Sequence, residues 1–80
     1  MEGGIELPHS KVSRSFEFVE GSSREFWEVA LSGSDVTTRW GRIGSEGQSK
    51  TKSFGSPEKA QAEYDKLVSE KTEKGYVEVT

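Results

Sequence analysis

The stretch VTTRWGRI at residues 36–43 decides the fold of this 80-residue chain, because it has the composition of a β-strand and turn residues bound it. β-Branched Val, Thr and Ile fill half of its positions, as is typical of strands. The clusters at residues 32–35 (SGSD) and 44–47 (GSEG) contain the small, polar and glycine residues of tight turns. The stretch therefore predicts one strand of an antiparallel sheet.

The segments around this strand extend the pattern to an antiparallel meander of four strands. A first strand begins at Arg14, where alternation places Phe16 and Phe18 on one face. After a Gly-Ser-Ser turn, a second strand is expected over residues 25–31. One face of that strand is apolar through Trp27, Val29 and Leu31. Residues 48–54 complete the meander as the return strand of the residue 36–43 segment.

A long helix follows the meander. Ser56 can cap its start, Pro57 suits the first helical position, and the helix is expected to run to about Lys74. Its apolar stripe comprises Ala60, Tyr64, Leu67, Val68 and the stem of Lys71. Gly75 fits the left-handed residue that ends helices, and a short final strand is possible after it. The fold class is therefore α+β, an antiparallel sheet of four to five strands with one long helix packed on one face.

The N-terminal segment differs from the rest of the chain. Residues 1–13 contain Gly3, Gly4 and Pro8 without a hydrophobic period, so we expect a flexible tail before one small domain over residues 14–80. His9 lies in this tail without a second ligand at metal-binding spacing, which favours a solvated histidine. The chain has no cysteine. No metal cluster or nucleophile–His–acid arrangement can be assembled, so we expect no metal, no cofactor and no enzyme activity.

Charge is distributed unevenly along the chain. The formal net charge is -3, yet residues 36–54 carry +3 and the segments on either side are acidic. The basic residues of the middle segment are Arg39, Arg42, Lys50 and Lys52. No apolar run approaches the roughly 20 residues of a membrane span. We therefore expect no membrane partner, a monomer, and a cytoplasmic location, or a nuclear one in a eukaryotic parent protein.

The orientation of the residue 36–43 strand determines which side chains could form a site. Strict alternation puts Trp40 and Arg42 on one face and Ile43 on the other. If Ile43 is the core residue, Trp40 and Arg42 point away from the helix. Two observations leave this open, because Val36 falls on the Trp40 face and Gly41 could mark a bulge that breaks the alternation.

The Trp40-Gly41-Arg42 sequence resembles the signature of the WGR domain. The likeness continues through Gly47-Gln48, Phe54-Gly55, Ala60 and residues 70–76, and it spans residues 15–79. In the WGR domains of DNA-damage-dependent poly(ADP-ribose) polymerases, the motif tryptophan packs against the sugar of the terminal nucleotide at a DNA break, near its phosphate. The resemblance implies that role for Trp40. Arg42 matches the motif arginine, which in those polymerases also helps to hold neighbouring domains together.

Two functions from different classes remain open. The first is a noncatalytic nucleic-acid-binding module that prefers a DNA end, a nick or a 5′ phosphate, with DNA favoured over RNA. In that function Trp40 stacks on a sugar or base, and phosphates are held by Arg39, Arg42, Lys50 and Lys52. The second is a protein–protein or interdomain docking module that uses the same Trp-Gly-Arg patch. The local basic cluster favours the first function and the overall acidity favours the second.

Overall fold

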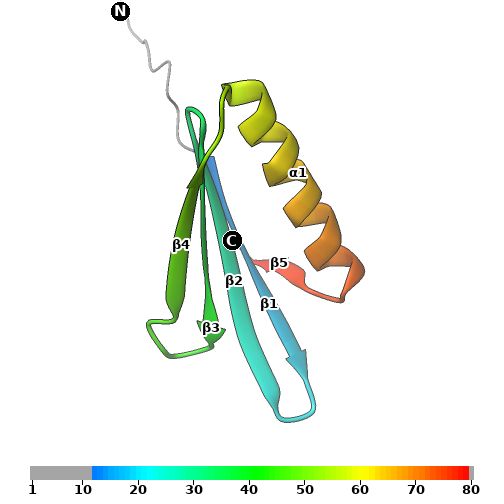
Figure 1. Cartoon of the computed structure of the whole chain (residues 1–80). Coiled ribbons are helices and arrows are strands. Elements are labelled where there is room, and N and C mark those ends of the chain that lie inside the picture. Colours follow the sequence, from blue (N-terminus) through cyan, green and yellow to red (C-terminus); the bar gives the residue numbers. More distant parts are fainter. Residues whose placement is uncertain (1–11, 80) are drawn as a thin grey trace, which may run out of the picture.

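A computed structural model describes residues 12–79, which form an antiparallel sheet with one helix across one face (Figure 1). The elements are β1 (Val12–Glu20), β2 (Ser23–Ser32), β3 (Asp35–Arg42), β4 (Gln48–Ser53), α1 (Pro57–Glu73) and β5 (Val77–Val79). The five strands lie in the order β4-β3-β2-β1-β5. The chain thus runs as a meander through β4, crosses the sheet as α1, and returns to pair β5 with β1. The α+β fold expected from the sequence is confirmed.

The strands begin and end close to the predicted turns. Glu20 pairs with Ser23 around a two-residue turn in which Gly21 has a φ of 62°. Such positive φ values suit glycine and are typical of tight hairpins. Val12 and Ser13, which the sequence assigned to the tail, belong to β1. Cross-strand pairing with β2 extends β1 beyond its own alternating pattern. His9 lies outside the described residues.

The structure confirms the sequence signals for both ends of α1, the cap at Ser56 and the glycine at residue 75. Ser56 has an extended backbone, and its hydroxyl accepts a hydrogen bond of 3.2 Å from the amide of Lys59. This bond satisfies one of the amide groups that the first helical turn leaves without a partner. Beyond Glu73, Gly75 has a φ of 107° and turns the chain back toward the sheet. The short strand β5 follows.

The core lies between α1 and the centre of the sheet. The buried residues of this cluster are Phe16, Trp27, Val29, Leu31, Val36, Ala60 and Tyr64. The helix contributes Ala60 and Tyr64 from the predicted stripe, while Leu67 and Val68 are half-buried against the same cluster. Large aromatic side chains therefore supply much of the buried area in a domain too small for a deep core.

The expectation that Trp40 and Arg42 point away from α1 is wrong. Trp40 pairs directly with Trp27, and Val36 pairs with Leu31. Directly paired residues share a face of the sheet, so Trp40 lies on the face that carries the core. The pairing is continuous through Gly41, which excludes a bulge there. Ile43, chosen as the core residue from the sequence, lies beyond the end of β3 and is half-buried.

Two further properties concern the described part of the chain. The helix in residues 12–79 is not long and apolar enough to cross a membrane. Over the same residues, His, Cys, Asp and Glu side chains form no group of three or more that could hold a metal ion.

Phe16 provides a test of the core, because its side chain is 1% exposed at the centre of the sheet. We expect Phe16→Ala to lower the free energy of unfolding by about 3–5 kcal/mol, the cost of removing a buried aromatic ring. On the same strand, Val19 is 55% exposed, so Val19→Thr should change stability by no more than about 0.5 kcal/mol. Urea unfolding followed by circular dichroism measures both variants. Equal losses would contradict the assigned core.

Candidate nucleic-acid interface

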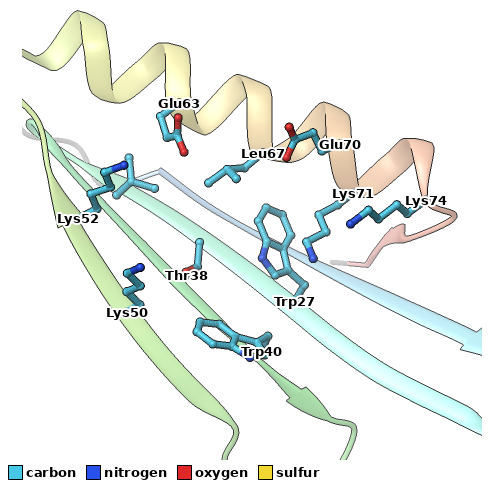
Figure 2. Close-up of a pocket in the computed structure, with 11 residues that line it drawn as sticks. Trp27, Thr38, Trp40, Lys50, Lys52, Glu63, Leu67, Glu70, Lys71 and Lys74 are labelled. Atoms are coloured by element: carbon cyan, nitrogen blue, oxygen red, sulfur yellow. The ribbon is translucent and has the colours of Figure 1, made fainter.

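A groove of about 390 Å³ lies between α1 and the strands β2, β3 and β4 (Figure 2). Its lining residues come from the sheet and from the part of the chain that runs from the middle of α1 to the residue capping its end. They are Trp27, Val36, Thr38, Trp40, Lys50, Lys52, Glu63, Leu67, Glu70, Lys71 and Lys74. The groove therefore combines two indole rings with four lysines and two glutamates.

The two tryptophans of the groove differ in accessibility. Trp27 is 4% exposed, whereas Trp40 beside it on β3 is 37% exposed. The helix and the stem of Lys71 cover the Trp27 ring, and the Lys71 Nζ lies 5.5 Å from its centroid. Trp40 is thus an aromatic surface that a ligand can reach, supported by a buried aromatic neighbour.

Lysines from the edge strand form one side of the groove. Lys50 pairs with Thr38, and Lys52 pairs with Val36, so both lysines share the face of Trp40. The Lys52 Nζ lies 5.3 Å from the centroid of the Phe54 ring. The sequence predicted that these two lysines share a face beside the Trp40 strand, and this is confirmed.

The last turns of α1 form the other side of the groove, where Lys71 is the central residue. Its ammonium lies 5.0 Å from the centroid of the Tyr76 ring in addition to its contact with Trp27. Burial lowers the pKa of Lys71, and the nearby charge of Lys74 lowers it further, while Glu25 and Glu70 act in the opposite direction. The sequence identified only the stem of Lys71, as part of the apolar stripe. The position of Lys71 on the stripe that faces the sheet was the sequence signal that could have placed its ammonium in the groove.

A second hollow of about 330 Å³ adjoins Lys71 and opens toward the end of β3. Trp40, Arg42, Lys71 and Tyr76 all contribute to it. The Tyr76 hydroxyl donates a 3.1 Å hydrogen bond to the carboxylate of Glu25. Burial raises the pKa of Tyr76, and this bond raises it further. Trp40 and Lys71 line both hollows and therefore connect them.

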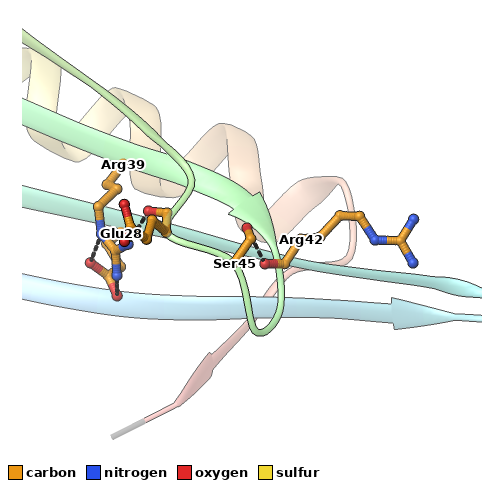
Figure 3. A network of polar contacts seen from close by, with 5 residues as sticks. Glu28, Arg39, Arg42 and Ser45 are labelled. Carbon is orange, nitrogen blue, oxygen red and sulfur yellow. Dashed lines mark hydrogen bonds and ion pairs between the residues drawn. The ribbon is translucent and has the colours of Figure 1, made fainter.

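Arg42 occupies the end of β3, with its side chain extended past the strand (Figure 3). Its backbone carbonyl accepts a 3.0 Å bond from the Ser45 amide and a 2.7 Å bond from the Ser45 hydroxyl. The backbone of the motif arginine therefore anchors the turn, while its side chain is exposed and the residue contributes to the lining of the second hollow.

Arg39 lies on the opposite face of the sheet, so the structure does not bring it together with the other four predicted residues. Its guanidinium donates two 3.0 Å hydrogen bonds to the carboxylate of Glu28 (Figure 3). It also donates to the backbone carbonyl of Glu46 and lies 4.6 Å from the centroid of the Phe26 ring. Direct pairing of Glu28 with Arg39 across β2 and β3 produces this arrangement. Such bidentate contacts hold the side chain in one geometry.

Two glycines allow the turn after β3 to fold back against the strand. A Cβ at Gly41 would lie 2.8 Å from the Cα of Gly47 and 3.4 Å from the Phe26 ring. Gly47 has a φ of 73°, and a Cβ there would collide with the Trp40 carbonyl and lie 2.6 Å from Phe26. The motif glycine is thus required for close backbone approach beneath Trp40.

These features define a small α+β module with a basic, aromatic groove between its sheet and its single described helix. The family model of the WGR domain matches residues 12–80, and the chain belongs to this family. The WGR family is known as a nucleic-acid-binding module, and its members are small accessory domains that are generally noncatalytic.

Relatives and a solved structure agree with this assignment. The chain is 38% identical over 65 residues to Protein YehF and 31% identical over 67 residues to the uncharacterized protein YfeS, both from Escherichia coli K12. These alignments cover 81% and 84% of the chain but 24% and 28% of the relatives. A crystal structure from Bacteroides fragilis is similar with a TM-score of 0.84 and 39% identity, over 86% of this chain and 20% of that one.

The turn beneath Trp40 can be tested with two glycines that both have positive φ. A side chain at Gly44 would meet nothing within 4 Å, so Gly44→Ala should cost about 1–2 kcal/mol from backbone strain alone. We expect Gly47→Ala to cost roughly 1–3 kcal/mol more, because it adds a steric clash with Trp40 and Phe26. Chemical denaturation compares the stabilities, and the NMR signal of the Trp40 indole reports the local shift. Similar losses in both variants would contradict the close approach.

Proposed function

We propose that this chain is a noncatalytic DNA-binding module that recognises DNA ends, nicks or 5′ phosphates through Trp40, Arg42, Lys50 and Lys52. One observation carries the proposal. The accessible Trp40 ring lies on the same face as the two edge-strand lysines, and Arg42 ends the same strand. An aromatic ring beside several cations matches the sugar or base and the phosphates of one nucleotide.

The chemistry of this surface favours a break over intact duplex. In a continuous duplex both faces of each base are stacked on neighbours, whereas a terminal or nicked nucleotide leaves one face and its sugar accessible to Trp40. A 5′ phosphate adds a charge that Lys50, Lys52 or Arg42 can neutralise. Contacts of this kind position a protein on DNA without reading its sequence.

The small number of cations sets the strength of binding. Three basic groups, Arg42, Lys50 and Lys52, in a chain of net charge -3 predict weak and salt-sensitive association confined to one face. Arg39 is left out of the proposed contact because Glu28 already occupies its guanidinium on the other face. We further propose that the protein acts as a monomer. Its location would be the cytoplasm, or the nucleus if the parent protein is eukaryotic.

A docking role is the second candidate. The chain spans about a quarter of the length of its curated relatives. In those relatives, the region similar to this chain is therefore joined to further protein sequence. Trp40 and Arg42 are residue types that anchor protein interfaces. An apolar docking contact would depend weakly on salt, whereas phosphate binding would fall steeply. The salt dependence of binding therefore distinguishes the two functions.

Trp40 is the first residue to test. We expect Trp40→Ala to weaken binding to a nicked, 5′-phosphorylated duplex by about 1–3 kcal/mol, the range for loss of an aromatic stacking contact. Trp40→Phe retains a ring and should lose less. Fluorescence anisotropy at low salt measures affinity, with a duplex closed by loops at both ends as the unbroken control, and thermal melts verify folding. Wild-type affinity in a folded Trp40→Ala variant would contradict the stacking role.

The lysines are tested by salt dependence. We expect Lys50→Ala and Lys52→Ala each to flatten the plot of log affinity against log salt by up to about one unit, because each removes one phosphate contact. Lys66→Ala is the matched control, since Lys66 is an exposed residue on α1 that does not line the groove. If both edge-strand variants keep the wild-type slope, these lysines do not contact phosphates.

A further inference from the structure

We infer that the groove between α1 and the edge of the sheet takes a single-stranded nucleic-acid segment next to the break, and that Lys71 and Lys74 hold its phosphates. This inference rests on the proposed function and specifies the form of the ligand. It adds two helix residues to the surface formed by Trp40, Lys50 and Lys52. The argument starts from the arrangement of charge along the groove.

Lysines occur on both sides of the groove. Lys50 and Lys52 come from β4, Lys71 comes from the last turn of α1, and Lys74 is the residue that caps the end of this helix (Figure 2). On β4, lysines two residues apart are separated by about 6.6 Å along the strand, a spacing that suits successive phosphates of an extended chain. A phosphate chain lying along the groove would therefore meet cations from the sheet and from the helix.

The acidic residues limit where phosphates can lie. Glu63 and Glu70 are on the helix side, and Glu63 lies one turn before Leu67, away from the end of the helix. Like charges repel phosphates at that end of the groove. At the other end Glu70 precedes Lys71 in the helix, but the two cations Lys71 and Lys74 outnumber it, so that end is the favoured position.

The size of the groove and its aromatic residue favour a single strand. A volume of about 390 Å³ lies near the lower end of the roughly 300–1,000 Å³ range of small-ligand pockets, which suits individual nucleotides. The helix bounds the groove along one side (Figure 2), which favours a single strand over a wider duplex. Unpaired bases expose their faces, and one of them can stack on Trp40.

Lys71 is the residue best placed to link the two hollows. Its ammonium lies 5.5 Å from the centroid of the Trp27 ring and 5.0 Å from that of Tyr76, so the charge is held at the junction instead of moving freely in solvent. A charge fixed in advance loses less conformational freedom when it binds a phosphate. A strand that leaves the groove past Trp40 would next meet Arg42 in the second hollow.

The experiment compares two 5′-phosphorylated hairpin duplexes, one blunt and one with a single-stranded 5′ extension of about six nucleotides, within the usual site sizes of single-strand-binding folds. Fluorescence anisotropy at low salt gives both affinities. We expect the extended DNA to bind wild-type protein roughly 2- to 30-fold more tightly, the effect of two exposed ion pairs between phosphates of the extension and Lys71 and Lys74. The combined variant Lys71→Met with Lys74→Gln should lose most of this preference and keep its affinity for the blunt DNA.

Controls separate the possible outcomes. Lys71→Met retains an unbranched stem at this position. If the combined variant unfolds, Lys74→Gln alone is measured instead. Lys66→Gln is the control and should behave as wild type. Glu63→Gln should increase affinity for the extended DNA. Equal wild-type affinity for blunt and extended DNA overturns the inference and leaves the proposed function intact. A preference that persists in the Lys71 and Lys74 variants overturns the assigned groove. If wild-type protein binds neither the blunt nor the extended DNA, both the inference and the proposed function are overturned.

Discussion

The register between β2 and β3 is the constraint on which both faces of the domain depend. It pairs Trp27 with Trp40 on the core face and Glu28 with Arg39 on the other. Because side chains alternate along a strand, a slip of one residue would exchange these faces. Trp40 would then leave the groove and Arg39 would lose its carboxylate. The close approach of Gly47 to β3 reinforces the register by fixing where the strand turns.

The helix serves the core and the groove with different parts of its length. Ala60 and Tyr64, in its first half, are buried on the sheet. Toward its end the helix carries Lys71 and Lys74 beside the exposed indole of Trp40. Core packing and the proposed ligand contact are thus separated along one element, so we expect substitutions near the end of α1 to alter binding while the packing of Tyr64 is retained.

Much of the fold follows from local sequence signals. Alternation around Phe16, glycine turns, the Ser56 cap and the stop at Gly75 each have a local physical cause, and each is found in the structure. The predicted orientation of β3 is wrong because it rests on Ile43 as the core residue, whereas Val36 is the residue that is buried. Pairing across strands decides such orientation, and it also determines that Arg39 meets Glu28. No single segment contains that information. The position of Lys71 between two aromatic rings depends in the same way on tertiary packing.

The edge strand β4 has a consequence for solubility. All six of its residues are exposed, and its outer backbone groups have no neighbouring strand within the described sheet. An open edge of this kind can pair with another chain, and lysines are a common protection against such pairing. Lys50 and Lys52 therefore have a second effect, since two copies brought edge to edge would place like charges side by side. A partner that neutralises these lysines would also remove this barrier to self-association.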